Sequence, residues 1–193
     1  MTEAPIGRRE RKKAATRQAI ADAAVRLFLE RGYDQVSIRE IADAADVSTT
    51  TLFKHFSGKE ALVFDQEQDV EAGLVAAVRE RVPGQGVVEA LRQHVLARWL
   101  AFVEHPQMDE FSALVRSTPA LRAYSERMWT RHTDRLAAAI ADEAGVPHDD
   151  LACATLARFV LQVPALTDGR PDQRAAVGTV FDILEHGWTL TSS

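Results

Sequence analysis

The 193-residue chain has little of what builds a cross-linked, secreted or membrane-embedded protein. Its single cysteine, Cys153, excludes an internal disulfide and a zinc site made of several cysteines from one chain. No apolar run approaches the roughly 18 residues of a membrane span, and the polar stretch 1–13 is not followed by the apolar segment of a signal peptide. Asparagine is absent, which excludes Asn-Gly hairpin turns and N-glycosylation. We therefore expect a cytoplasmic protein with no membrane partner.

Positive charge is scarce over most of the chain and is concentrated near the N-terminus. Lys+Arg 23 against Asp+Glu 28 gives a net charge of −5, which argues against a protein that coats nucleic acid indiscriminately. Residues 1–60 nevertheless carry 11 basic and 9 acidic side chains, whereas residues 61–193 carry 12 and 19. This asymmetry favours either a local nucleic-acid site in the first third or a solvated basic terminus.

The composition predicts an all-α fold. The chain contains 31 alanines, prolines divide its later part into helix-length pieces, and no segment alternates strongly enough to be a strand. We predict a domain of three helices with a basic arm over residues 1–56, followed by a domain of six helices over 57–193. The nine helices are expected near 11–31, 37–44, 48–55, 59–81, 87–104, 107–115, 119–144, 149–166 and 171–190.

Three serines precede expected helices and predict their starts. Ser37 with Glu40, and Ser57 with Glu60, both match the capping box, in which serine and glutamate satisfy N–H groups of the first turn. Ser48 stands directly before the helix between them.

Residues 37–56 have the pattern of a helix-turn-helix unit. Two short helices place their apolar sides together across the turn 45–47, and Leu52 and Phe56 face inward from the second helix. The outward positions are then Thr50 and Lys54, flanked by Thr49 and Phe53 on one side and by Thr51 and His55 on the other. Hydroxyl groups, a cation and an aromatic ring on one face suit a DNA major groove. The alternative is the ordinary polar face of a small helical bundle.

The order and spacing of these residues resemble the TetR family of bacterial regulators. The residues that carry the resemblance are Thr16-Arg17-Gln18-Ala19-Ile20, Ala23-Ala24, Leu27-Phe28, Gly32-Tyr33, Ser37, Ile41-Ala42, Ala45, Val47-Ser48, Leu52-Phe53, His55-Phe56 and Lys59-Glu60-Ala61-Leu62. Two positions depart from the family pattern. Asp46 replaces the usual glycine of the turn, so it must accept left-handed torsions, and Phe53 replaces a tyrosine, whose phosphate contact is thereby lost.

The resemblance implies a DNA-binding transcriptional regulator, expected to be a repressor, that binds a palindromic operator as a homodimer. The residues that it places against DNA are Thr16, Arg17, Ser37, Arg39, Ser48, Thr49, Thr50, Phe53, Lys54, His55 and Lys59. Arg17, His55 and Lys59 are expected to anchor phosphates, and an unstructured arm over residues 8–13 is expected to enter the minor groove.

The last two helices carry apolar stripes that are candidates for a dimer interface. Paired with a second copy, they would form an intersubunit four-helix bundle. Its predicted residues are Leu156, Val160, Val177, Phe181, Leu184 and Trp188. The alternative is an internal helical hairpin.

Bulky apolar side chains earlier in the second domain are candidates for an effector pocket. They are Trp99, Phe102, Phe111, Leu114, Val115, Trp129 and Phe159, with Gln162 as a polar member. Ordinary core packing is the alternative for each of them. The stretches 52–56, 63–64 and 76–78 are also similar to regulators associated with mycofactocin clusters, which implies an apolar or acyl-type effector such as a long-chain acyl-coenzyme A.

No catalytic pattern is recognisable, because the chain lacks Glu-x-x-His, His-Glu-x-x-His and Gly-x-x-x-x-Gly-Lys motifs. We therefore expect neither enzymatic activity nor a cofactor or metal. The competing function is that of a helical adaptor protein without sequence-specific DNA binding.

Overall fold

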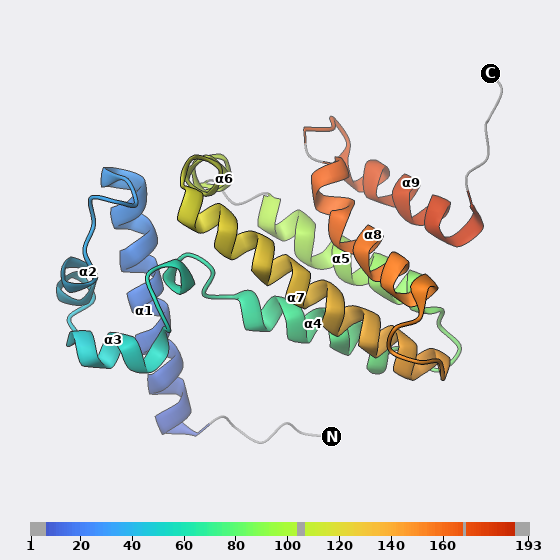
Figure 1. Ribbon diagram of the computed structural model, residues 1–193, viewed down its shortest axis with the longest axis horizontal. Coiled ribbons are helices and arrows are strands. Elements are labelled where there is room, and N and C mark those ends of the chain that lie inside the picture. The colour runs from blue at the N-terminus through green and yellow to red at the C-terminus, as the bar shows by residue number, and fades with distance from the viewer. Residues whose placement is uncertain (1–6, 104–106, 168, 188–193) are drawn as a thin grey trace. The chain divides into compact units, whose positions relative to one another are not determined.

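The computed structural model describes residues 7–103, 107–167 and 169–187, without the side chains of residues 99–103. Over this part of the chain the all-α prediction is confirmed (Figure 1). The helices are α1 (Arg8–Arg31), α2 (Ile38–Ala44), α3 (Thr49–His55), the 3-10 helix η1 (Glu60–Leu62), α4 (Glu67–Arg79), α5 (Val87–Val103), α6 (Met108–Ser117), α7 (Pro119–Ala144), α8 (Leu151–Thr167) and α9 (Gln173–His186). None of the helices described is both long and apolar enough to cross a membrane.

The chain forms two compact units. The head unit comprises the residues up to Gln66 together with Asp109–Tyr124, and the body unit comprises Glu67–Met108 together with the residues from Ser125 onward. This division differs from the boundary predicted between residues 56 and 57. The reason is packing, since Leu114 and Leu121 join the same buried cluster as Phe28 and Leu62. The head unit therefore includes α6 and the first turn of α7.

Two of the three predicted caps form, and they fix where α2 and α3 begin. The Ser37 hydroxyl accepts from the Glu40 N–H at 3.2 Å, and the Glu40 carboxylate accepts from the Ser37 N–H at 2.8 Å. Hydrogen bonds from Ser37, followed by that from Arg31, lower the pKa of Glu40 to about 2. The Ser48 hydroxyl accepts from the Thr51 N–H at 3.0 Å.

The helix predicted over residues 59–81 is interrupted, and the capping box predicted at Ser57 is not formed. The chain makes the short helix η1, which begins after Lys59 without a side-chain cap, and α4 starts only at Glu67. Ala61 and Leu62 are buried in the head core. Their burial holds this segment against α1 and prevents one continuous helix.

The body unit is built around α5, which packs against α4 on one side and α9 on another, while α8 packs against α9. Its core consists of residues from α4, α5, α7, α8 and α9, including Val78, Leu91, Leu136, Val160 and Phe181, each at most 1 % exposed. An ion pair between Arg92 and Asp182, at 2.9 Å, joins α5 to α9 at the surface. Burial of these apolar side chains, far more than surface ion pairs, stabilises the unit.

Candidate nucleic-acid interface

Helix α3 buries one face and exposes the opposite one, as predicted. Leu52 is fully buried and Phe56 is 3 % exposed, which fixes the rotation of the helix about its axis. Thr49, Thr50 and Lys54 are exposed on the other face. Phe53 is 56 % exposed, an unusual environment for a phenylalanine in a head that has a well-formed core. This face offers hydroxyl groups, one cation and one aromatic ring to a binding partner.

The turn before α3 has the conformation that the sequence requires. Asp46 has a φ of +52° and is the only non-glycine residue with positive φ among those described. The expectation for Asp46 is therefore confirmed. Aspartate tolerates this left-handed region better than most residues do, and the Val47 N–H can then donate to the Ala42 carbonyl at 3.0 Å. The chain thus reverses within three residues and directs α3 across α2.

Arg17, which is predicted to anchor a phosphate, makes several contacts within the head unit. Its guanidinium is half-buried and donates to the His55 carbonyl at 2.6 Å and to the Asp65 carbonyl at 2.8 Å. The guanidinium carbon also lies 4.3 Å from the centre of the Phe56 ring. Arg17 therefore ties α1 to the end of α3 and to the segment that precedes α4.

Lys59, for which a phosphate contact is predicted, also makes contacts within the head unit. Its Nζ donates to the Tyr33 carbonyl and lies 4.1 Å from the centre of the Tyr33 ring and 5.4 Å from that of Phe28. Burial lowers the pKa of Lys59 and raises that of Tyr33. The ammonium group thus fastens the loop after α1 to the start of η1.

His55 lies at the edge of the exposed face. It is half-buried, and burial, followed by the positive charges of Arg17 and Lys13, lowers its pKa. The imidazole is therefore neutral near pH 7 in the free protein. The hydrogen bond from Arg17 to the His55 carbonyl places the first half of α1 beside the end of α3.

The basic N-terminal stretch is helical rather than an unstructured arm. α1 begins at Arg8, so the predicted arm over residues 8–13 forms its first turns and is exposed. Backbone N–H donors at the start of the helix carry a partial positive charge that adds to the side-chain charges. Because the helix holds these cations at fixed spacing, the positive electrostatic potential at this end of α1 is stronger than that of an unstructured arm.

The other predicted DNA contacts divide into capping and surface residues. Ser37 and Ser48 use their hydroxyl groups as helix caps, and the Thr16 hydroxyl donates to the Lys12 carbonyl at 3.0 Å. Arg39 is exposed on α2. The candidate interface is therefore Arg39 with the exposed face of α3, bordered by the first turns of α1.

The predicted effector residues are divided between the two units. Phe111, Leu114 and Val115 pack against the head core, where Phe111 lies 6.3 Å edge-on from Phe64. Trp129 and Phe159 belong to the body unit and are 39 % and 48 % exposed. The apolar pattern alone does not show that α6 contributes to the head core. Gln162 is exposed, and the side chains of Trp99 and Phe102 lie outside the described residues.

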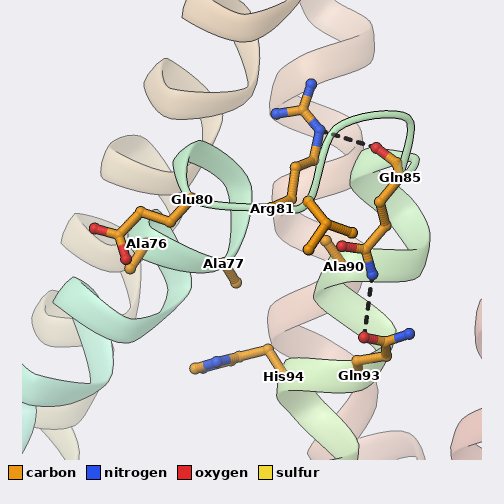
Figure 2. A pocket seen from close by; sticks show the side chains of 9 residues that line it. Ala76, Ala77, Glu80, Arg81, Gln85, Ala90, Gln93 and His94 are labelled. Carbon is orange, nitrogen blue, oxygen red and sulfur yellow. Dashed lines mark hydrogen bonds between the residues drawn. The ribbon is translucent and has the colours of Figure 1, made fainter. Parts of the chain in front are cut away.

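A surface groove of about 340 Å³ lies between the end of α4 and the start of α5 (Figure 2). Figure 2 shows Ala76 and Ala77 of α4, with Glu80 directly after this helix, on one side and Ala90, Gln93 and His94 of α5 on the other. At its upper end the Gln85 amide donates to the Gln93 carbonyl oxygen at 3.1 Å. No residue of the predicted effector set lines this groove. Its polar side chains partly satisfy one another, so the groove alone does not define a ligand site.

The residues predicted for the dimer interface are mostly internal. Val160, Val177 and Phe181 are at most 1 % exposed in the body core, and Leu156 and Leu184 are half-buried against it. They therefore form the internal hairpin that was the alternative. Trp188 lies outside the described residues. The opposite faces expose other apolar side chains, namely Leu151, Phe159 and Leu166 on α8 and Ile183 on α9, which are 79 %, 48 %, 51 % and 42 % exposed.

Comparison with known proteins agrees with this architecture. Residues 20–65 match the family model described as "Bacterial regulatory proteins, tetR family", and residues 85–168 match the one described as "MftR C-terminal domain". The chain is 32% identical over 151 residues to the HTH-type transcriptional regulator TcmR of Streptomyces glaucescens, covering 75% of this chain and 67% of that protein. It is 30% identical over 189 residues to the HTH-type transcriptional repressor Rv1474c of Mycobacterium tuberculosis, covering 90% and 92%.

A solved structure shares the fold. The TetR-family regulator SCO0857 of Streptomyces coelicolor superimposes with a TM-score of 0.61 at 22% sequence identity, and the alignment covers 88% of this chain and 92% of that chain.

Proposed function

We propose that this chain, which belongs to the TetR family of bacterial regulatory proteins, is an effector-controlled repressor that binds a palindromic operator as a homodimer. The observation that carries the proposal is the exposed face of α3. Thr49, Thr50 and Lys54 stand opposite a fully buried Leu52, and the Ser48 cap fixes the first turn. A rigid, short helix with these groups outward fits the major groove of DNA.

The contacts proposed for DNA follow from side-chain chemistry. The threonine hydroxyls and the Lys54 ammonium suit base edges and phosphates, and the exposed Phe53 ring suits a thymine methyl group or a sugar. Arg39 and the basic first turns of α1 supply phosphate contacts from either side. In a homodimer the two α3 helices would enter successive major grooves about 34 Å apart.

The dimer is proposed to form through the exposed apolar stripe rather than through the residues first predicted. Phe159 and Leu166 on α8, with Ile183 on α9, leave large apolar side chains in water unless another surface covers them. A second copy, related by a two-fold axis, covers such a stripe with itself. The interface would still be a bundle of four helices, α8 and α9 from each copy, as first predicted.

Effector control is proposed to act by population shift. An apolar or acyl-type ligand that binds one arrangement of the body more tightly changes the separation of the two heads and releases the operator. Each buried methylene contributes about 0.8 kcal/mol, so a long acyl chain supplies the several kcal/mol that such a shift needs. The match of residues 85–168 to the MftR C-terminal domain agrees with the resemblance from which this effector class was predicted.

No enzymatic activity and no cofactor are proposed. The named relatives are transcriptional regulators, and the described residues contain no group of three or more His, Cys, Asp or Glu side chains able to hold a metal ion.

The test is selection of duplexes from a randomised pool, followed by affinity measurements on the selected operator. We expect Lys54→Ala and Thr50→Ala each to weaken binding by about 1–3 kcal/mol, the usual loss for one good base contact. Arg26→Ala is the matched control, because Arg26 is exposed on α1 and pairs with Glu30 at 3.5 Å. Binding that depends on salt but survives both substitutions unchanged would instead favour the helical adaptor.

A further inference from the structure

His132 lies on the buried face of α7, where the helix pattern calls for an apolar side chain. It is 1 % exposed, and its neighbours one turn away in each direction, Met128 and Leu136, are 5 % and 0 % exposed. Nδ1 of its ring lies 3.0 Å from Oε2 of Glu71 on α4. Nε2 is buried without a hydrogen-bond partner, the only such side-chain nitrogen or oxygen in the part of the chain that the structure describes.

The Glu71 carboxylate determines which ring nitrogen carries the proton. A carboxylate can only accept, so in the neutral ring Nδ1–H donates to it and Nε2 is the nitrogen that accepts. The Arg135 Nε lies 3.8 Å from the other oxygen of Glu71 and adds a positive charge beside this carboxylate. An acceptor without a donor in an apolar interior is unfavourable. The arrangement is therefore incomplete until a donor from outside the chain reaches Nε2.

The surroundings indicate what kind of donor fits. Both nearby carboxylates are already paired with a cation, since Glu67 lies 3.1 Å from Arg131 and Glu71 faces Arg135. No unpaired negative charge is therefore left for a cationic ligand. The Trp129 ring stands edge-on to the His132 ring, with ring centres 5.5 Å apart. Because Trp129 is 39 % exposed, its indole forms an aromatic surface that extends from solvent toward the imidazole.

We infer that Nε2 of His132 is the polar anchor of a ligand site in the body unit. The ligand is an apolar molecule that packs on Trp129 and donates one hydrogen bond from a neutral hydroxyl or N–H group. Glu71 is the positioning residue that holds the imidazole in the accepting tautomer. The inference rests on the proposed function only in identifying this ligand as the effector. Trp129 is the one residue of the predicted effector set that belongs to this site.

The experiment uses the full-length protein with labelled histidine nitrogens, observed by NMR, and pairs of probes that differ only in the donor. The pairs are phenol and anisole, naphthol and methoxynaphthalene, and decanol and decyl methyl ether. For at least one pair we expect the alcohol to bind about tenfold or more tightly than its ether and to shift the Nε2 resonance of His132. His132→Phe keeps a ring of similar size and should reduce that preference to within about twofold. His148→Phe, at an exposed position in the turn before α8, should retain it.

Three results would overturn the inference: equal binding of alcohol and ether in every pair, a preference that survives in His132→Phe, or an Nε2 resonance that no probe shifts. The last result would indicate that Nε2 is hydrogen-bonded only to a buried water molecule. Operator affinity is measured in parallel. Selective alcohol binding that leaves operator affinity unchanged contradicts the effector role. Selective binding by a wild-type protein that recognises no duplex supports the site and contradicts the proposed function.

Discussion

Replacing Arg17 by methionine keeps an unbranched stem and removes the guanidinium that joins three parts of the head. In the wild-type chain this group donates to the carbonyls of His55 and Asp65 and lies over the Phe56 ring. His55 is the last residue of α3, so the positive charge sits at the negative end of the helix dipole. We expect Arg17→Met to weaken operator binding because α3 loses its anchor, without loss of a phosphate contact.

The magnitude follows from these three contacts. A hydrogen bond from a charged donor contributes about 1.5–3 kcal/mol when buried, and a cation over an aromatic ring adds about 0.5–1 kcal/mol at exposed sites. Because Arg17 is half-buried and solvent screens its charge, we take roughly half and expect the free energy of unfolding to fall by about 2–4 kcal/mol. The corresponding decrease in Tm is about 6–12 °C for a chain of this size. Operator affinity should fall by at least as much as one mismatched base pair costs, which is about 1–3 kcal/mol.

The assay combines urea unfolding with fluorescence anisotropy of a labelled operator at several salt concentrations. If Arg17 positions α3, the variant binds more weakly but keeps the slope of log affinity against log salt. If Arg17 contacts a phosphate, that slope decreases by about 0.9 for each subunit, and stability is unchanged. This second outcome would refute our reasoning. Arg26→Met removes an exposed guanidinium from the same helix and should change neither stability nor affinity.

Three further predictions concern the caps, the dimer and pH. Ser37→Ala should lower the free energy of unfolding in urea by about 1 kcal/mol because it removes the cap of α2, whereas Ser57→Ala, at a serine that caps no helix, should leave it unchanged; equal effects would contradict the structure. Phe159→Glu should convert the dimer to a monomer in size-exclusion chromatography with light scattering, and Val146→Glu, an exposed control on the turn before α8, should not; a dimer that survives Phe159→Glu places the interface elsewhere. Burial and neighbouring cations lower the pKa of His55, so the unfolded chain binds the proton first, and stability should decrease as pH falls through about 6.5. Urea titrations of His55→Gln should show a smaller decrease, and an identical pH profile would exclude this origin.

Local signals account for the parts of the fold that could be predicted. Helical periodicity and the Ser37 and Ser48 caps define α2 and α3 within a residue, because capping is decided by atoms three residues apart. The same sequence pattern at Ser57 led to the wrong prediction of a capping box. There the tertiary burial of Ala61 and Leu62 outweighs the local capping preference, and no pattern within a single helix reveals that competition.

The exposed face of the candidate interface could be predicted from the sequence, but the internal contacts that support it could not. The outward face of α3 follows from the inward positions of Leu52 and Phe56. The roles of Arg17 and Lys59 do not, because their acceptors are backbone carbonyls 38 and 26 residues away. A basic residue in a family motif gives no indication of whether its charge serves DNA or the protein interior. His132 had a sequence signal, a polar residue between apolar neighbours spaced four apart, which the aromatic residues obscured.

The buried contribution of Leu114 and Leu121 to the head core limits how this regulator can be recombined with others. A hybrid that grafts only residues 1–66 onto a foreign sensor discards part of the apolar cover over its own first three helices. The transplanted piece would then expose that surface to aggregation or proteolysis. A graft that keeps this cover must also carry Asp109–Tyr124, so the head unit has to be transferred as two separate stretches of sequence.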